Sequence, residues 1–325
     1  MSGTYVYQGK EAVANRVVYG QTVARLGETD PRIVVLDADI SKSTNTFHFA
    51  KKFPERFFNM GAAEQNLISV SAGLATMGLV PFASTFAMFA CLRASEQVRT
   101  SVCYPRLNVK IVATNAGLEI AGDGVTHQAT EDLAIMRAIP NLTVVSPSDP
   151  VTTEWATEAI AAYNGPVYMR LGRQDARVIH RAGTKFELGR MVELRNGADV
   201  AIIATGHMVE QALLAADVLA GRGIRARVLD CHTIKPIDRE AIVRAAKETA
   251  GIVTAEDHNV IGGLGAAVCE VTAEAAPALV KRVGVNDRFC SSGRDYRKLM
   301  AHYGVDAAAI VVKAEEIVQG KRGMG

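Results

Sequence analysis

The repeated alternation of short β-branched runs with longer alanine-rich segments constrains the fold of this chain more than any other feature. In the first half, the strand-like runs occupy residues 32–37, 79–83, 109–114, 142–146 and 166–171. Helix-like segments lie between them, including residues 11–27 and 152–162. Strands that alternate with helices in this way are typical of an α/β fold with a mostly parallel sheet.

The alternation is interrupted at residues 173–187, where the sequence is polar and basic and lacks strong periodicity. Such a stretch indicates a linker. After it the pattern restarts, with strand-like runs at residues 198–205, 224–230, 250–257 and 279–285. A length of 325 residues is compatible with two ordinary domains. We therefore predict two doubly wound α/β domains, at residues 1–185 and 186–325, each with a mostly parallel sheet.

Charge and cysteine content narrow the possible partners and compartments. The chain has 36 basic and 34 acidic residues, a balance that predicts neither nucleic acid nor a membrane surface as a partner. Its five cysteines include no CxxC pair, which favours free thiols in a reducing cytoplasm. The N-terminus has no apolar segment behind a positive one, so we expect no signal peptide.

One uncharged stretch, residues 67–92, is long enough to cross a bilayer. Serine, threonine, glycine and proline residues interrupt it, however, and Gly78 and Pro81 indicate a break. We therefore expect a helix, a turn and a buried strand here, and no membrane span.

The loop at residues 121–132, AGDGVTHQATED, contains GDG, the sequence by which many thiamine diphosphate enzymes hold a magnesium diphosphate. Asp123 lies between two glycines, so the backbone can turn tightly there. With His127, it follows a strand and precedes a helix that we expect near Thr130, where open α/β sheets bind ligands. A magnesium site needs further oxygen ligands, and Asn141 follows too soon to supply one. The loop therefore predicts either a ligand site without metal or an ordinary strand-to-helix connection.

Several segments together resemble the pyrimidine-binding domain of transketolases. They are NMGAAEQNLISVSAGLATMGLVPFASTFAMFA, DGVTHQ, SPSDP and GPVYMRLGR. The second predicted domain resembles the transketolase C-terminal domain. The N-terminal transketolase domain, which carries the diphosphate and magnesium site, has no counterpart in the chain. The chain thus resembles the C-terminal subunit of a split transketolase.

The resemblance implies a site for the aminopyrimidine ring of thiamine diphosphate. Glu64 corresponds to the glutamate that contacts N1′. A carboxylate there stabilises the protonated ring and favours an imino group at the 4′ position, which can remove the proton from thiazolium C2. Phe86 and Phe89 correspond to the aromatic pocket around the ring. Leu92 replaces the third aromatic residue of that pocket, and Asp39 is also assigned to the cofactor.

The resemblance also implies a substrate site. Arg16, Ser43 and Arg173 correspond to residues that hold the terminal phosphate of a sugar, and a guanidinium offers paired donors to such a group. Asp123 and His127 would contact sugar hydroxyls near the bond that is cut and formed, with His127 counted among the catalytic residues.

Two departures from the family pattern affect this interpretation. Asn115 stands where transketolases have a phosphate-binding histidine, and Gln65 stands where a histidine usually follows the glutamate. Both weaken the case for ordinary pentose phosphates. Deoxyxylulose-phosphate synthases have a basic residue at the position of Ala116, so the sequence is closer to transketolases there.

The function implied is a transferase subunit that moves a two-carbon ketol unit from a ketose phosphate to an aldose. It would need an N-terminal subunit that binds the diphosphate and Mg²⁺ or Ca²⁺, in an α2β2 assembly. The stretch around Ser69, Ala72, Gly73 and Thr76 gives one helix face with little side chain, which the resemblance places at an interface. The alternatives are a subunit of a decarboxylating enzyme (2-oxo acid dehydrogenase or deoxyxylulose-phosphate synthase) and a non-catalytic sensing or scaffold subunit.

A second glycine-rich stretch, in the later half, invites a dinucleotide-binding interpretation. Gly262, Gly263 and Gly265 follow a strand, but Val268 occupies the last small position of GxGxxG. We therefore expect a tight turn there, with His258 in a structural or interfacial role.

Overall fold

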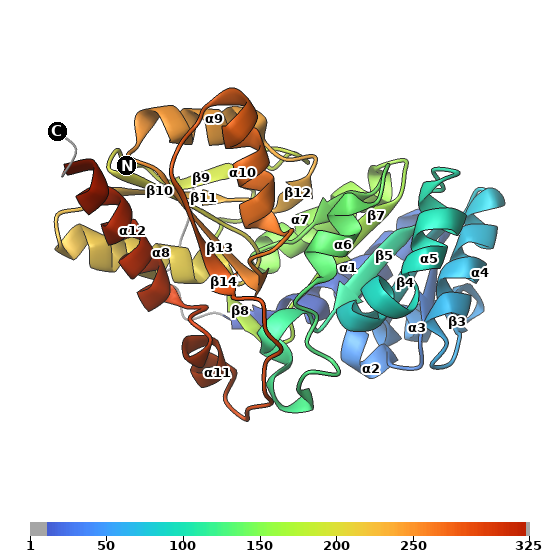
Figure 1. Ribbon diagram of the computed structural model, residues 1–325. Coiled ribbons are helices and arrows are strands. Elements are labelled where there is room, and N and C mark those ends of the chain that lie inside the picture. The colour runs from blue at the N-terminus through green and yellow to red at the C-terminus, as the bar shows by residue number, and fades with distance from the viewer. Residues whose placement is uncertain (1–11, 323–325) are drawn as a thin grey trace.

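Two mostly parallel sheets, packed side by side, organise the part of the chain that the computed structural model describes, residues 12–322 (Figure 1). The first sheet has seven strands in the order β12-β6-β7-β5-β4-β2-β3, and the second has five in the order β14-β13-β10-β11-β9. Within these two sheets of the described chain, the edge strands β12 and β9 run antiparallel to their neighbours and the other strands are parallel. The predicted fold class is confirmed.

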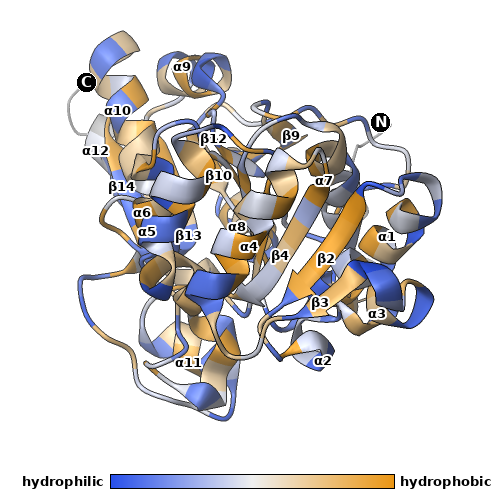
Figure 2. Ribbon diagram, turned by 90° about the vertical axis from the view of Figure 1, so that its right-hand side faces the viewer, coloured by the Kyte–Doolittle hydropathy of each residue, from blue (hydrophilic) through white to orange (hydrophobic). Residues whose placement is uncertain are grey.

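The five strands predicted for the first half are present at the centre of the first sheet. The strands of this sheet are β2 Ile33–Asp37, β3 Phe57–Asn59, β4 Val80–Phe86, β5 Lys110–Thr114, β6 Thr143–Val145, β7 Val167–Arg170 and β12 Thr233–Lys235. Strand β4 runs three residues further than expected and places Phe86 at its carboxyl end. Figure 2 shows β2 as hydrophobic along most of its length, as expected for a strand buried on both faces.

The four strands predicted for the second half are also present. The strands of the second sheet are β9 Val192–Arg195, β10 Val200–Ala204, β11 Ala226–Asp230, β13 Ile252–Asn259 and β14 Val280–Val285. The glycine-rich stretch forms the expected tight turn. Its geometry requires glycine, because a Cβ on Gly263 would lie 2.0 Å from the Glu256 carboxylate.

Helices cover both sheets and shape the loops at their edges. The α-helices are α1 Asn15–Thr29, α2 Ser41–Thr44, α3 Phe47–Lys52, α4 Glu64–Thr76, α5 Ser95–Gln97, α6 Asp132–Ala138, α7 Pro150–Ala162, α8 Met208–Gly221, α9 Arg239–Glu248, α10 Leu264–Ala275, α11 Tyr296–His302 and α12 Ala307–Arg322. Two π-helical turns, Phe89–Arg93 and Val98–Cys103, and two 3₁₀ turns, Pro54–Arg56 and Gly117–Asp123, complete the helical structure.

Two sequence expectations need correction. The helix predicted over 11–27 begins at Asn15, because residues 12–14 form strand β1. Strand β1 pairs antiparallel with β8, Asp175–Arg177, which lies inside the predicted linker. Three-residue strands are too short to show periodicity, which explains why the sequence pattern missed both. Residue 11 and the N-terminal stretch examined for a signal peptide lie outside the described residues.

The uncharged stretch 67–92 is confirmed as the end of a helix, a turn and a buried strand. Helix α4 ends at Thr76, Gly78 turns with a φ of 82°, and β4 follows. Pro81 does not break the structure but lies within β4. Within residues 12–322, none of the helices combines the length and apolar character that a membrane crossing requires.

The two halves of the chain share structure across the first sheet. Strand β12 comes from the second half, yet it pairs with β6 of the first. Lys235, its last residue, donates to the backbone oxygens of Arg137 and Ile139. The halves therefore cannot separate without breaking a strand pair.

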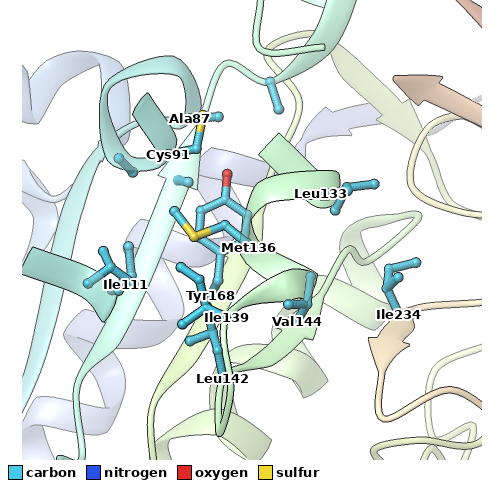
Figure 3. Packing of buried hydrophobic residues seen from close by; sticks show 14 of the residues in the cluster. Ala87, Cys91, Ile111, Leu133, Met136, Ile139, Leu142, Val144, Tyr168 and Ile234 are labelled. Carbon is cyan, nitrogen blue, oxygen red and sulfur yellow. The ribbon is translucent and has the colours of Figure 1, made fainter. Parts of the chain in front are cut away.

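A continuous hydrophobic cluster lies behind the first sheet and continues into the second half. Figure 3 shows Tyr168 beside Met136, with Ile139 and Leu142 close by. The described cysteines are all free, four of them buried, as expected for thiols that act as small apolar side chains.

Candidate active site

The residues predicted for a ligand site gather at the carboxyl edge of the first sheet. Phe86 ends β4 and Thr114 ends β5, and these two residues are paired in register. The loop that contains Asp123 and His127 follows β5, and Arg173 follows β7. Because parallel strands end at the same edge, residues far apart in sequence meet there.

Three aromatic rings form an apolar floor. The ring centroids of Phe86 and Phe89 lie 6.0 Å apart in a stacked arrangement. His127 meets both rings edge-on, at 5.3 Å from Phe89 and 6.0 Å from Phe86. Each such pair contributes about 0.5–1.5 kcal/mol beyond burial. Thr126 Oγ1 lies 2.9 Å from His127 Nδ1, which leaves Nε2 to meet a ligand.

Glu64 places a carboxylate beside this floor. Glu64 is the first residue of α4, and its side chain is 3% exposed. A negatively charged side chain is favourable at a helix N-terminus. Arg93 donates from Nη1 to Glu64 Oε2 at 2.7 Å, and its guanidinium lies 4.4 Å from the centroid of the Phe89 ring. The sequence analysis missed Arg93. No local pattern marked Arg93, because it lies on the π-helical turn Phe89–Arg93, whose spacing differs from that of an α-helix.

A cluster of cationic and polar groups lies next to the floor. Arg16 donates to the backbone oxygens of Ser43, at 2.8 Å, and Arg173, at 3.2 Å. Arg173 in turn donates to Asp123 Oδ2 at 2.8 Å. Burial lowers the pKa of Arg16, and the charge of Arg173 lowers it further. Two guanidinium groups held this close favour an anion between them.

Asp37 organises the loop that contributes Ser43. Its carboxylate accepts hydrogen bonds from Thr44 Oγ1 at 2.6 Å and Thr46 Oγ1 at 2.8 Å. Burial raises the pKa of Asp37, while these hydrogen bonds oppose the rise. On the other side, Gly20 of α1 lies so close that a Cβ would meet Asn45 O at 2.2 Å. This contact fixes α1, and with it Arg16, against the loop.

Three further residues from the predicted set lie at or near this edge. Asp39 is exposed, has a φ of 66° and accepts a hydrogen bond from Asn59. Leu92 is 47% exposed. Asn115 is buried, and its Oδ1 and the Oγ1 of Thr114 have no hydrogen-bond partner among the described residues. Buried polar atoms rarely stay unpaired, so these two are suited to a ligand or water.

Two buried ion pairs form the wall between this edge and the second sheet. Arg170 pairs with Asp132 at 2.8 Å, and also donates to Asp257 O of the second half. Asp132 is therefore a buried ion-pair partner as well as the first residue of α6. Glu119 lies 3.1 Å from His207 Nδ1. Burial raises the pKa of Glu119 to about 7, although His207 acts to lower it.

The arrangement matches known protein families over nearly its whole length. Residues 11–178 match the transketolase pyrimidine-binding domain, and residues 189–310 match the transketolase C-terminal domain. The chain belongs to the transketolase family. It corresponds to the C-terminal subunit of a split transketolase.

Three relatives of this transketolase subunit show how far the similarity extends. A putative transketolase C-terminal section of Methanocaldococcus jannaschii is 48% identical, over 96% of each chain. A 6-deoxy-6-sulfo-D-fructose transketolase subunit of Clostridium is 44% identical, over 94% of this chain and 95% of that one. A solved structure, described as a split gene transketolase in an inactive beta4 tetramer, is 50% identical with a TM-score of 0.88, and the match covers 94% of this chain and 99% of that one.

The transketolase pyrimidine-binding domain implies thiamine diphosphate, and the side chains at the carboxyl edge fit one end of that cofactor. The aromatic floor and the buried Glu64 carboxylate suit a flat, cationic heterocycle. Within residues 12–322, no three His, Cys, Asp or Glu side chains converge in a way that could hold a metal ion. Asp123 of the GDG sequence meets Arg173, and Asn141 donates its amide to Cys103 O.

Proposed function

We propose that this chain is the catalytic pyrimidine-binding subunit of a thiamine diphosphate-dependent transketolase, which transfers a two-carbon ketol unit from a ketose phosphate to an aldose. The observation that carries the proposal is the placement of Glu64 beside the Phe86–Phe89 floor, with the Arg16–Arg173 cluster next to it. When bound, the cofactor supplies the carbanion chemistry, and the protein supplies orientation and charge.

Each residue has a specific task in this proposal. The Glu64 carboxylate accepts the hydrogen bond of a protonated ring nitrogen and holds that proton in place. Phe86 and Phe89 orient the ring and exclude water from one face. His127 presents Nε2, and Asp123 its carboxylate, to sugar hydroxyls near the reacting carbons. Asp39 and Leu92 lie further out and would meet the edge of the cofactor.

The cationic cluster binds the far end of the sugar in this proposal. Arg16 and Arg173 supply guanidinium donors, and Ser43 supplies a hydroxyl. The Clostridium relative is named for a sulfo sugar, and a terminal anion is common to such a sugar and to a sugar phosphate. Asn115, in place of a cationic side chain, leaves fewer charges for the anion than an ordinary transketolase has.

The proposed assembly pairs this chain with an N-terminal subunit that binds the diphosphate and Mg²⁺ or Ca²⁺, in a cytoplasmic α2β2 complex. Helix α4 presents an exposed strip of small residues, including Ser69, Gly73 and Thr76, next to the Glu64 end of the site. A neighbouring subunit could approach closely along that strip. Ala72 points inward and belongs to the core.

Reconstitution tests this proposal. The chain is mixed with its N-terminal partner, thiamine diphosphate and Mg²⁺, and then given xylulose 5-phosphate as donor and ribose 5-phosphate as acceptor. Ketol transfer that requires both subunits supports the proposal. Release of carbon dioxide from pyruvate would support a decarboxylating enzyme instead. Cofactor binding without turnover of donors carrying a phosphate or sulfonate group would support a sensing or scaffold subunit.

A further inference from the structure

Arg93 makes two contacts at the proposed cofactor site. Its guanidinium lies over the ring of Phe89, 4.4 Å from the centroid, and donates to Glu64 Oε2 at 2.7 Å. The Glu64 side chain is 3% exposed, whereas that of Arg93 is 50% exposed. The guanidinium thus covers a buried acid from the solvent side.

These two contacts are the ones that the proposed function assigns to the aminopyrimidine ring. A guanidinium is a flat, delocalised cation with N–H donors in its plane. A protonated aminopyrimidine shares that shape, that charge and those donors. Two such groups cannot lie on the same face of Phe89 and donate to the same Glu64 oxygen at once.

We propose that Arg93 holds the place of the pyrimidine ring in the cofactor-free subunit and must leave Phe89 and Glu64 when the cofactor binds. The inference rests on the proposed function and adds a determinant of cofactor affinity that belongs to this chain. Arg93 shields the Glu64 carboxylate before assembly and competes with the ring during it.

The local structure allows Arg93 to leave. It is the last residue of the π-helical turn Phe89–Arg93, and such turns are frequent at functional sites. Its neighbour Leu92 is 47% exposed, so solvent lies on that side of the turn. An ion pair with one exposed partner is weak, and its rupture leaves the core beneath the turn intact.

Calorimetric binding of thiamine diphosphate to the assembled complex, with Mg²⁺ present, tests the inference. The Arg93→Ala variant should bind the cofactor about tenfold more tightly, because an exposed ion pair and a cation–π contact together amount to roughly one decade in affinity. Arg93→Lys keeps a donor but loses the flat face, and should fall between Arg93→Ala and the unaltered chain. Arg25→Ala removes an equally exposed arginine that pairs with Glu154, and should leave affinity unchanged.

Equal or weaker binding by Arg93→Ala would overturn the inference while leaving the proposed function intact. An unaltered complex that fails to bind the cofactor would overturn both. A crystal structure of the loaded complex gives a second readout, even if Arg93→Ala folds poorly. Arg93 displaced from Phe89 supports the inference, and Arg93 still stacked on Phe89 contradicts it.

Discussion

The carboxyl edges of the two sheets carry similar residues but use them differently. At the first edge, Asp39 and Asp123 are exposed, and the arginines nearby are partly open to solvent. At the second edge, Asp230, Glu256 and Asp257 are buried and bonded inside the protein. The exposed acids of the first edge lie in the loops at the candidate site, whereas the acids of the second edge lie in a seam within the protein. Asp37, which ends β2, is a buried exception at the first edge.

The second edge is closed because its acids meet the first half of the chain or cap their own helix. Asp257 accepts the Leu118 N–H, and Glu256 accepts two N–H groups at the start of α10. His258, buried beside them, accepts the Ala134 N–H. The position of an acid at a strand end therefore does not reveal a site. An acid at a strand end is available to a ligand only where no other part of the chain already bonds to it.

The largest effect is expected at the open edge, from Glu64→Gln. The variant keeps the shape but cannot hold a proton as a carboxylate does, so transfer activity of the reconstituted complex should fall on the order of 10²- to 10⁴-fold. The melting temperature should stay close to that of the unaltered chain, because Arg93, the charged partner of Glu64 among residues 12–322, is half-exposed.

Steady-state rates and a thermal melt of the same preparation check this prediction. Full activity would remove Glu64 from its proposed role. A large fall in melting temperature would instead make Glu64 a structural acid like those of the second edge, and would erase the contrast between the edges.

At the edge of the second sheet, the Asp230→Asn substitution should lower the free energy of unfolding. Asp230 Oδ2 accepts hydrogen bonds from Ser148 and, at 2.8 Å, from His180 Nε2. Burial lowers the pKa of His180, but the hydrogen bond and charge of Asp230 raise it more. Breaking such a buried pair should cost about 3 kcal/mol of unfolding free energy.

Urea unfolding measures this loss. The control is Asp217→Asn, at an exposed ion pair with Arg195, for which a change below about 1 kcal/mol is expected. Equal changes in the two variants would show that burial at the second edge adds nothing.

The sequence predicted the open edge better than the closed one, for a physical reason. Strands and their ends follow from local hydrophobic runs, and parallel strands bring their ends together, so the position of the Asp123–His127 loop at this edge could be anticipated. Arg16 and Arg173 were assigned to the site by the resemblance to transketolases. The pairs that close the second edge join residues far apart in sequence, such as His180 with Asp230. Nothing in a local pattern specifies such a partner.

Strand β12 and Arg93 show two further limits of prediction. Strand β12 has three residues and joins the sheet of the other half, so neither its length nor its position signals it. Arg93 lies on a π-helical turn, whose spacing differs from that of an α-helix. The structures of β12 and of the turn that carries Arg93 depend on tertiary contacts, which a local sequence pattern does not specify.

A smaller effect is expected from Arg16→Met, which tests whether the edge of the first sheet binds the terminal anion of the substrate. The loss of charge-assisted hydrogen bonds should cost about 1.5–3 kcal/mol of substrate binding. KM for a phosphorylated acceptor should therefore rise at least tenfold, with kcat less affected. KM for the matching unphosphorylated aldose should stay the same, because its far end carries no anion.

The Arg16 comparison has its own control. Arg190→Met removes an exposed arginine from an ion pair with Glu240, far from the site in sequence and on the other half. Equal rises in KM for the two kinds of acceptor would mean that Arg16 positions the loop through Ser43 and does not bind an anion.

The smallest effect concerns the boundary between the two edges, where Glu119 meets His207. The pKa of Glu119 is raised by burial from 4.5 to about 7. Between these values the unfolded chain releases a proton that the folded chain keeps. Stability should therefore be fully present below pH 4.5 and fall as the pH rises toward 7, by roughly 1–3 kcal/mol.

Glu119→Gln removes this titration. As the pH rises from 5 to 7.5, the free energy of unfolding should therefore fall less in the variant than in the unaltered chain. Urea midpoints across that range measure it, and Glu154→Gln, at an exposed ion pair with Arg25, is the control for the loss of a surface carboxylate. A difference independent of pH would mean that burial does not raise the pKa of Glu119 in the folded chain. Glu119 lies four residues before Asp123 in the same 3₁₀ segment, so the result also decides whether the closed seam reaches as far as the proposed substrate loop.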